Sequence, residues 1–182
     1  MSLGISEFKG QFSGGGARPN LFKVQMDFPG IVGDGGLSYK AGFLIKAASL
    51  PASVLGEIPI GYRGRKLKIA GDRTFANWTV TVLNDTSMDL RNQFELWLEM
   101  VNSNESNTSA ISNISGTEGY YANPTVIQLD RQENEVKTYQ FVDAFPVNIQ
   151  DIALDFDTND AVEEFTVEFA YQYWTSFAGT MS

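Results

Sequence analysis

The chain has 182 residues and a net charge of −9, with 43% hydrophobic and 13% aromatic residues and neither cysteine nor histidine. A single domain of this length buries enough apolar surface to fold without disulfides or structural metals. The two missing residue types exclude disulfides, thiolate and imidazole metal ligands and His- or Cys-dependent catalysis, and the acidic charge argues against wrapping nucleic acid.

The first sixteen residues have the composition of a mobile arm. They end in Ser-Gly-Gly-Gly, which is typical of flexible segments. They lack the basic and apolar stretches of a signal peptide, and no part of the chain approaches the roughly eighteen apolar residues of a membrane helix. We therefore expect a soluble, cytoplasmic protein that does not insert into membranes.

Two strands and a hairpin are predicted after this arm. Residues 21–28 alternate between apolar and polar side chains, as in a half-buried strand. Residues 39–49 are predicted to be the partner strand, with Tyr39, Phe43, Ile45 and Ala47 facing inward. The glycine-rich residues 33–36 can adopt the positive φ angles of a tight connection between them.

A basic cluster precedes the most regular strand. Residues 58–85 hold five of the thirteen basic residues, namely Arg63, Arg65, Lys66, Lys68 and Arg73. Residues 66–70 alternate briefly, Gly71-Asp72 predicts a turn, and residues 75–83 alternate as a central strand. Such a cluster ordinarily keeps a turn hydrated. The alternative is a contact arm whose cations meet acidic surface on an identical neighbour.

One helix is predicted over about residues 87–101. Thr86-Ser-Met-Asp89 resembles a capping box at its start. Apolar residues then recur at intervals of three and four, which is typical of a helix packed on a sheet rather than of a cofactor site. They are Leu90, Phe94, Trp97, Leu98 and Val101. The polar residues 102–119 predict a long exposed loop.

The last third of the chain predicts further strands, at residues 125–129, 138–143, 149–156 and 162–174. Phe145-Pro146 is expected to separate the second of these from the third. The fourth is the longest. Its apolar residues, Phe165, Val167, Phe169, Tyr171 and Tyr173, alternate with polar ones.

Candidate sites for catalysis or ligands are weak. Residues 155–160 resemble the start of a calcium loop, but its sixth position is Asp160 instead of Gly and its twelfth is Thr166 instead of Glu. The glycine groups lack the spacing of phosphate or dinucleotide loops. Carboxylates are abundant, so counts alone leave a glycosidase-like acid–base pair open, but nothing marks one as buried or paired. We predict no catalytic residue, metal or cofactor.

A series of short motifs runs through most of the chain. In order they are Ala17-Arg-Pro-Asn-Leu-Phe22, Leu50-Pro-Ala52, Ile58-Pro-Ile-Gly61 with Arg65-Lys66, Ala70-Gly-Asp-Arg-Thr-Phe75, Trp78-Thr-Val-Thr-Val82 with Asn84-Asp85, Phe145-Pro146, and Phe165-Thr-Val167 with Tyr173-Trp174. Together they resemble the tail tube protein of T-even-like contractile-tailed bacteriophages, in that family's order.

The resemblance implies a fold, an assembly and partners. The fold would be mainly β, with two packed antiparallel sheets forming a sandwich or partial barrel and one flanking helix. A single domain over residues 17–174 would lie between the arm, 1–16, and a tail, 175–182. Six-membered rings would stack into the inner tube of the virion's contractile tail, through which DNA passes without specific binding. The other partners would be the sheath, baseplate tube-initiator, terminator and tape-measure proteins, with assembly in the host cytoplasm.

The resemblance also suggests which residues make contacts. In the family, the long loop before the Ala-Gly-Asp-Arg strand reaches neighbouring subunits, and residues 51–72 correspond to it. We predict an inter-subunit contact arm comprising Arg63, Arg65, Lys66, Asp72 and Arg73. Candidate acids lining the bore are Asp151, Asp155, Glu164 and Glu168.

Several alternatives stay open at this point. Within the same class they are the tube of a phage-derived bacteriocin, a secretion tube resembling haemolysin-coregulated protein, and a baseplate tube-initiator paralogue. From other classes they are a sugar-binding β-sandwich and a small acidic hydrolase.

Overall fold

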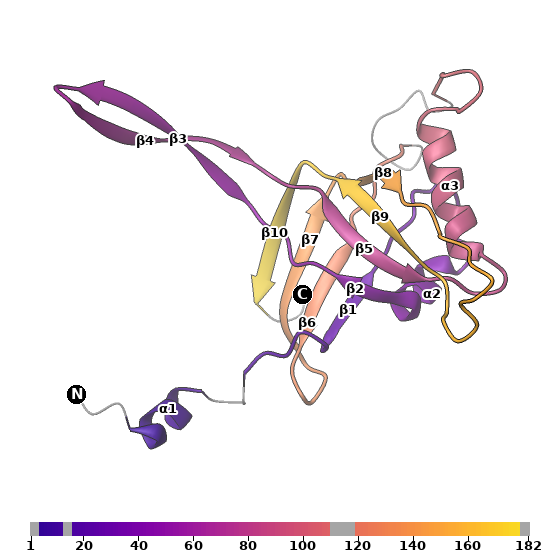
Figure 1. Cartoon of the computed structure of the whole chain (residues 1–182), viewed down its shortest axis with the longest axis horizontal. Coiled ribbons are helices and arrows are strands. Elements are labelled where there is room, and N and C mark those ends of the chain that lie inside the picture. Colours follow the sequence, from indigo (N-terminus) through magenta and orange to yellow (C-terminus); the bar gives the residue numbers. More distant parts are fainter. Residues whose placement is uncertain (1–3, 13–15, 110–118, 179–182) are drawn as a thin grey trace.

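The body of the molecule is a sandwich of two antiparallel sheets, from which a two-stranded ribbon extends (Figure 1). The computed structural model describes residues 4–12, 16–109 and 119–178. One sheet has the strand order β1-β6-β7-β10 and the other has the order β2-β5-β9-β8, while β3 and β4 form the ribbon. The predicted mainly β fold of two antiparallel sheets is confirmed.

The strands and helices have the following bounds. The first sheet comprises β1 (Phe22–Gln25), β6 (Thr125–Leu129), β7 (Glu135–Val142) and β10 (Tyr173–Ala178). The second comprises β2 (Ile45–Ala48), β5 (Trp78–Leu83), β9 (Glu164–Ala170) and β8 (Phe145–Ile149). The ribbon strands are β3 (Val54–Tyr62) and β4 (Arg65–Thr74), and the helices are α1 (Ile5–Gln11), α2 (Leu37–Leu44) and α3 (Asp89–Val101).

Aromatic side chains fill the space between the sheets. Trp78 of β5 stacks on Phe141 of β7 with ring centroids 4.3 Å apart, and so joins the two sheets. From α3, Phe94 packs on Phe169 of β9 at 6.0 Å. The Trp78 indole N–H donates to the Ser49 carbonyl at 2.9 Å, so this buried polar group is satisfied. The apolar faces predicted for β5 and α3 are therefore the core.

The predicted first hairpin is wrong. Residues 37–44 form α2 instead of a strand, β1 pairs with β6, and β2 pairs with β5 in the other sheet. Tyr39 and Phe43, predicted to face inward, are 77% and 71% exposed. Their spacing of four fits a helical turn as well as an alternating strand. Asp34 favours the helix, because its carboxylate accepts the amide N–H of Ser38 at 2.8 Å and that of Gly36 at 3.1 Å.

The turn predicted at Gly71-Asp72 is also wrong, because β4 runs through it without interruption. The ladder between β3 and β4 instead has an irregularity between Leu55 and Glu57, and here two glycines let the backbones approach closely. A Cβ atom on Gly56 would lie 3.1 Å from the Asp72 carbonyl oxygen, and one on Gly71 would lie 3.2 Å from that of Gly56.

The strands at the end of the chain are divided differently from the prediction. Phe145-Pro146 begins β8 rather than separating two strands, and Pro146 is tolerated because β8 is an edge strand. The strand predicted over 149–156 is absent, since β8 ends at Ile149 and residues 150–163 form a loop. The long strand predicted over 162–174 is two strands, β9 and β10, which lie in different sheets.

The helix start and the chain ends also differ from expectation. The N-cap residue of α3, Met88, has a φ of 55° and its side chain makes no capping hydrogen bond, while the Ser87 hydroxyl donates to Asp85. The capping box is therefore wrong, although α3 itself lies where predicted. Helix α1 forms within the expected flexible arm, and β10 runs to Ala178, past the expected domain end.

Part of the predicted polar loop, residues 110–118, lies outside the described residues, whereas residues 102–109 are largely exposed. Residues 1–3 and 13–15 of the predicted mobile arm, and 179–182 of the predicted tail, also lie outside them. Within the described part of the chain, no helix is long and apolar enough to span a membrane.

Candidate assembly surfaces

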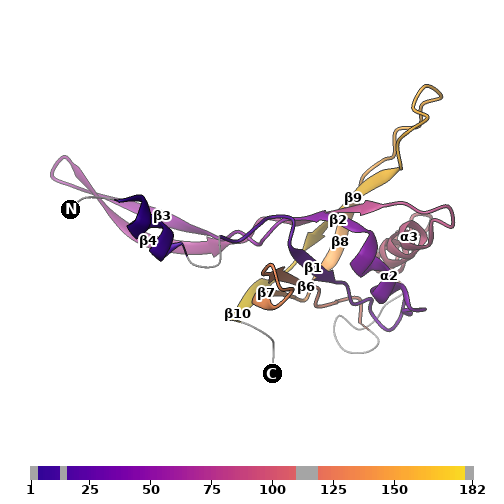
Figure 2. The same ribbon diagram turned by 90° about the horizontal axis from the view of Figure 1, so that it is seen from below.

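The ribbon of β3 and β4, here called the arm, consists of residues 54–74. Its two-residue turn places Arg63 at φ 45° and Gly64 at φ 81°, as a type I′ hairpin requires. Every residue of β3, and every residue of β4 except Gly71, is exposed. Figures 1 and 2 both show the arm pointing away from the sandwich. Within the described residues, no side chain of the arm is therefore buried against the rest of the chain.

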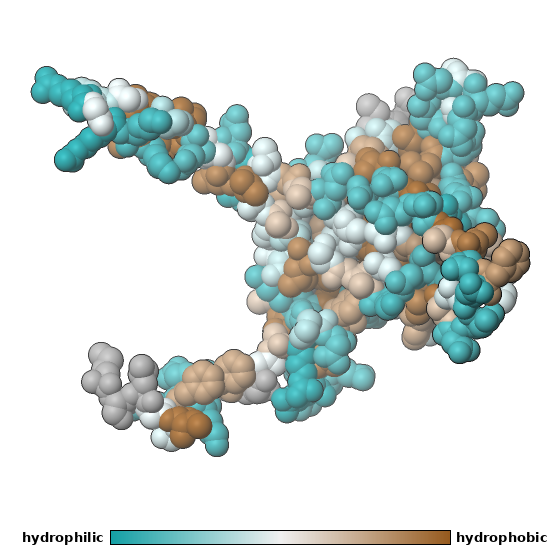
Figure 3. Space-filling view, viewed as in Figure 1, coloured by the Kyte–Doolittle hydropathy of each residue, from teal (hydrophilic) through white to brown (hydrophobic). Residues whose placement is uncertain are grey.

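Strand alternation gives the outer half of the arm two different faces. The register places Ile58 opposite Ile69 and Ile60 opposite Leu67, so these four side chains lie on one side. We call them the apolar face; each remains between 45% and 61% exposed. The other side carries Glu57, Pro59, Lys66 and Lys68. Brown side chains are visible along the arm in Figure 3, and its tip is teal.

Only some of the charges on the arm are neutralised within the chain. The Lys68 ammonium lies 2.8 Å from a Glu57 carboxylate oxygen, and the Arg63 guanidinium lies 5.4 Å from the ring of its neighbour Tyr62. Among the residues that the structure describes, no ion pair involves Arg65, Lys66 or Arg73. Within the described part of the chain, Arg65, Lys66 and Arg73 of the arm therefore have no anion paired with them.

The five predicted contact residues divide into two groups. Arg63, Arg65 and Lys66 meet at the tip, whereas Asp72 and Arg73 lie near the base of β4. An extended strand rises about 3.3 Å per residue, which separates the two groups by roughly 20 Å. The basic cluster is therefore compact in sequence but not in space.

The four predicted bore acids also divide. Glu164 and Glu168 lie on the outer side of β9, alternating with the buried Phe165 and Val167, as the strand pattern predicts. Asp151 and Asp155 belong to the 150–163 loop rather than to a strand face. The structure thus gives these acids no single common surface.

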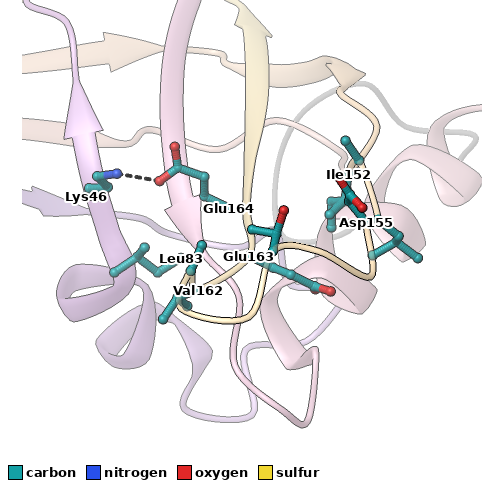
Figure 4. Close-up of a pocket in the computed structure, with 11 residues that line it drawn as sticks. Lys46, Leu83, Ile152, Asp155, Val162, Glu163 and Glu164 are labelled. Carbon is teal, nitrogen blue, oxygen red and sulfur yellow. Dashed lines mark hydrogen bonds and ion pairs between the residues drawn. The ribbon is translucent and has the colours of Figure 1, made fainter.

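One open hollow is lined by both Glu164 and Asp155, which lie on different parts of its wall (Figure 4). It has a volume of about 620 Å³ and is lined by β2, β9 and the 150–163 loop. Within it the Lys46 ammonium lies 2.5 Å from a Glu164 carboxylate oxygen. Glu163, on the same wall, accepts a hydrogen bond from the Asn84 amide at 3.2 Å. Across the described ranges, no group of three or more carboxylates is placed to hold a metal ion.

Two apolar surfaces were missed by the sequence reasoning. On α2, Tyr39 and Phe43 form an exposed edge-to-face pair with centroids 4.9 Å apart. On α1, Ile5, Phe8 and Phe12 are all exposed. The signals were present, namely Asp34 shortly before α2 and the four-residue spacing of each aromatic pair. In addition, β1 and β10 are the edges of one sheet, and β2 and β8 are the edges of the other.

Residues 17–176 match the family model described as phage tail tube protein. The chain belongs to this family. It is 34% identical over 164 residues to the tail tube protein gp19 of Enterobacteria phage T4, covering 89% of this chain and 93% of that protein. It is 28% identical over 169 residues to the tail tube protein of Serratia phage KSP90, covering 92% and 93%. The predicted tail tube family is confirmed.

The fold of this tail tube family member also occurs in solved contractile assemblies. A chain of the anti-feeding prophage baseplate superposes with a TM-score of 0.62 at 17% identity, covering 90% of this chain and 96% of that one. A chain of the sheath–tube complex of an extracellular contractile injection system superposes with a TM-score of 0.52 at 13% identity, covering 97% and 99%. At such low sequence identities, the similarity to these chains concerns the fold alone.

Proposed function

We propose that this chain is the repeating subunit of the inner tube of a contractile phage tail, in which six-membered rings stack into a conduit for DNA. The observation that carries the proposal is the arm, which projects from the sandwich with its apolar face uncovered. Family membership and the fold shared with a sheath–tube complex support it.

The physical argument begins with the stability of the arm. A two-stranded hairpin is marginal in water unless a further layer covers it. Burying an Ile or Leu side chain stabilises a contact by about 1.5–3 kcal/mol. In a tube, the covering layer is a neighbouring subunit. In the proposal, the surface that receives the arm is a different part of the neighbouring subunit, so the contact is head-to-tail, and a head-to-tail contact can close into a ring.

The cations at the tip of the arm serve a second purpose in this proposal. Arg63, Arg65 and Lys66 precede the apolar face as the arm approaches a neighbour, and each subunit carries a net charge of −9. Complementary charge accelerates encounter and selects the register more than it adds affinity. Asp72 and Arg73 would meet a different part of the neighbour, because they lie near the base.

The outer face of β9 is our candidate for the wall of the bore. There Glu168 has no ion-pair partner within the described residues, whereas Lys46 neutralises Glu164. A wall of like charge keeps DNA from adsorbing while it passes. Asp151 and Asp155, on a projecting loop, are less suited to this wall than the two glutamates. A tube map with a positive bore would contradict the assignment.

Electron microscopy of the purified chain tests the proposal. We expect rings with six-fold symmetry, or tubes built from them, and we expect no catalytic activity. A stable monomer that binds or cleaves glycans would contradict the proposal and favour the sugar-binding or hydrolase alternative.

A second candidate within the same class is a baseplate tube-initiator, because the fold also matches a chain of a contractile baseplate. An initiator would form single rings and would not elongate into tubes. A bacteriocin or secretion tube would form the same polymer as a phage tail. Neighbouring capsid and terminase genes would identify a phage.

A further inference from the structure

Helix α1 presents an apolar stripe that stays largely exposed, although the Phe12 ring lies against Gly16. Ile5 and Phe8 of α1 and its C-cap residue Phe12 recur at intervals of three and four and so lie on one side. The rings of Phe8 and Phe12 stack with centroids 5.5 Å apart, and the three residues are between 52% and 76% exposed. Gly10 lies on the opposite side. A helix of seven residues with no buried residue needs an external surface to be stable.

A groove of suitable character lies between β1 and α2. It has a volume of about 410 Å³ and is lined by residues 23–27 and by Ser38, Tyr39, Gly42 and Phe43. Helix and strand approach closely at Gly42, where a Cβ atom would lie 3.3 Å from the Val24 carbonyl oxygen. The exposed Tyr39–Phe43 pair forms one side of the groove, and β1 is an edge strand.

One charge beside the stripe is complementary to one at the groove, which also carries Lys23. Asp27 stands at the groove without an ion-pair partner in the described part of the chain. Desolvation by its surroundings raises the pKa of the Asp27 carboxyl, and the nearby Asp34 charge acts in the same direction. A cation placed here would stabilise the carboxylate. Lys9 lies in the last turn of α1, next to the apolar stripe.

Helix α1 does not lie near the groove of its own subunit. Figures 1 and 2 both show α1 and α2 well apart. The segment that leads to α1 is attached to β6 at residues 18–21. There the Gln128 side-chain amide donates to the carbonyl oxygens of Arg18 and Leu21 at 2.8 and 2.6 Å. From this point the helix leads away from the groove. A repeating head-to-tail contact needs two different surfaces on each subunit, one that projects and one that receives it. Here they are α1 and the groove.

We propose that α1 of one subunit docks in the β1–α2 groove of a second copy. Phe8 and Phe12 pack beside Tyr39 and Phe43, and Lys9 pairs with Asp27. The inference rests on the proposed function only in taking the second copy to be a neighbour in the tube. It is separate from the arm, and α1 also lies outside the family match, which begins at residue 17.

Engineered cysteines test the contact between α1 and the groove, and no native cysteine can form a competing disulfide, because the chain has none. Phe8→Cys and Phe43→Cys are made in separate full-length proteins with tags of different size, then mixed, assembled and oxidised. We expect a disulfide between the two proteins, visible on a non-reducing gel. The matched control is Gly10→Cys, on the opposite side of α1 with open space around its Cβ position. It should cross-link to Phe43→Cys at least tenfold less.

The outcomes separate this inference from the proposed function. If tubes form but neither Phe8→Cys nor Phe12→Cys links to Phe43→Cys or Tyr39→Cys, the docking is wrong and the tube proposal stands. A link found within single chains carrying both Phe8→Cys and Phe43→Cys, but not in the mixture, also overturns it. If the wild-type protein forms neither rings nor tubes, the proposed function fails, while a link in the mixture would still support docking between copies.

A second measurement does not depend on cross-linking. The double variant Phe8→Ser/Phe12→Ser should raise the concentration of free subunits in equilibrium with tubes at least tenfold. The melting temperature of the monomer should not change, because α1 has no buried residue. An unchanged free-subunit concentration would overturn the inference.

Discussion

The sandwich and the arm use the same alternating pattern with different results. In β5, Trp78, Val80 and Val82 alternate with polar residues and are at most 1% exposed. In β3, Ile58 and Ile60 alternate in the same manner and are 54% and 46% exposed. Alternation therefore predicts a strand with one apolar face, but not whether that face is covered by the same chain or by another copy.

This difference separates two kinds of stability. The free energy of unfolding depends on the sandwich, and the free energy of assembly depends on the arm. Substitutions in the two regions should therefore change different measurements.

The largest effect is expected in the sandwich, from Phe141→Ala. Phe141 is fully buried and stacks on Trp78, so its removal opens a cavity between the two sheets. We expect the free energy of unfolding to fall by about 3–5 kcal/mol, with loss of both monomer stability and assembly. Thermal and urea denaturation of the monomer provide the measurement. A melting temperature within about 2 °C of wild type would contradict the assignment of the core.

The next effect concerns the arm, through Ile60→Asp. Because Ile60 is exposed in the subunit, we expect the monomer to unfold as wild type does. Placing a carboxylate in the buried contact removes about 2 kcal/mol of apolar burial and adds a desolvation cost. The free-subunit concentration above tubes should rise at least thirtyfold in sedimentation assays. The matched control is Glu57→Gln, on the opposite face and outside the predicted contact residues, which should assemble nearly as wild type; an equal loss of assembly in both variants would contradict the two-faced arm.

The sequence predicted the core elements well because their patterns are local. The stripe of α3 and the alternation of β5 each identify an apolar face from a few neighbouring residues. The structure has a projecting ribbon at residues 54–74, close to the predicted contact loop 51–72, but the predicted shape was wrong, since Gly71-Asp72 lies inside β4 rather than in a turn. The contacts of this ribbon with other subunits stay a prediction. The true turn, Arg63-Gly64, lay within the basic cluster.

Other features could not be predicted because they depend on distant partners. The change of sheet between β9 and β10 is set by pairing with β5 and β7, which no local pattern reveals. The spacing of Tyr39 and Phe43 fitted both a helix and a strand. The four candidate bore acids do not all lie on strands, because the strand predicted over 149–156 does not form. Strand β8 ends at Ile149, and Asp151 and Asp155 lie in the loop that follows.

A smaller effect is expected from charge at the tip of the arm. Arg65→Glu/Lys66→Glu reverses two cations that have no ion-pair partner within the described residues. Lys66 lies on the side opposite the apolar face, whereas Arg65 lies on the same side as that face but nearer the tip. We expect the rate of assembly to fall about tenfold at low ionic strength and to approach that of wild type near 0.5 M salt, where exposed charges are screened. Light scattering over time provides the measurement. Normal assembly at physiological salt would show that the charges are incidental.

The smallest effect is expected from Asp34→Ala, at the start of α2. The N-cap residue Gly36 has no side chain, so the Asp34 carboxylate accepts the Ser38 amide instead. Removing such an exposed cap should cost about 0.5–1 kcal/mol, seen as a lower monomer melting temperature at pH 7. The same substitution also removes the charge that disfavours ionised Asp27, which offsets part of the loss.

The pH dependence of this effect separates the charge of Asp34 from its hydrogen bond. The hydrogen bond from Ser38 lowers the pKa of Asp34 in the folded state, whereas the pKa of an Asp in an unfolded chain is about 3.9. The carboxylate's contribution is thus fully present above about pH 4 and is lost as the pH falls through the lower folded value. The difference between wild type and Asp34→Ala should shrink by pH 3. Asp34→Asn retains an acceptor oxygen without a charge, so its melting temperature relative to Asp34→Ala should stay constant between pH 7 and pH 3. If that difference also shrinks with acidification, another group carries the pH dependence, and the Asp34 carboxylate is not what starts α2.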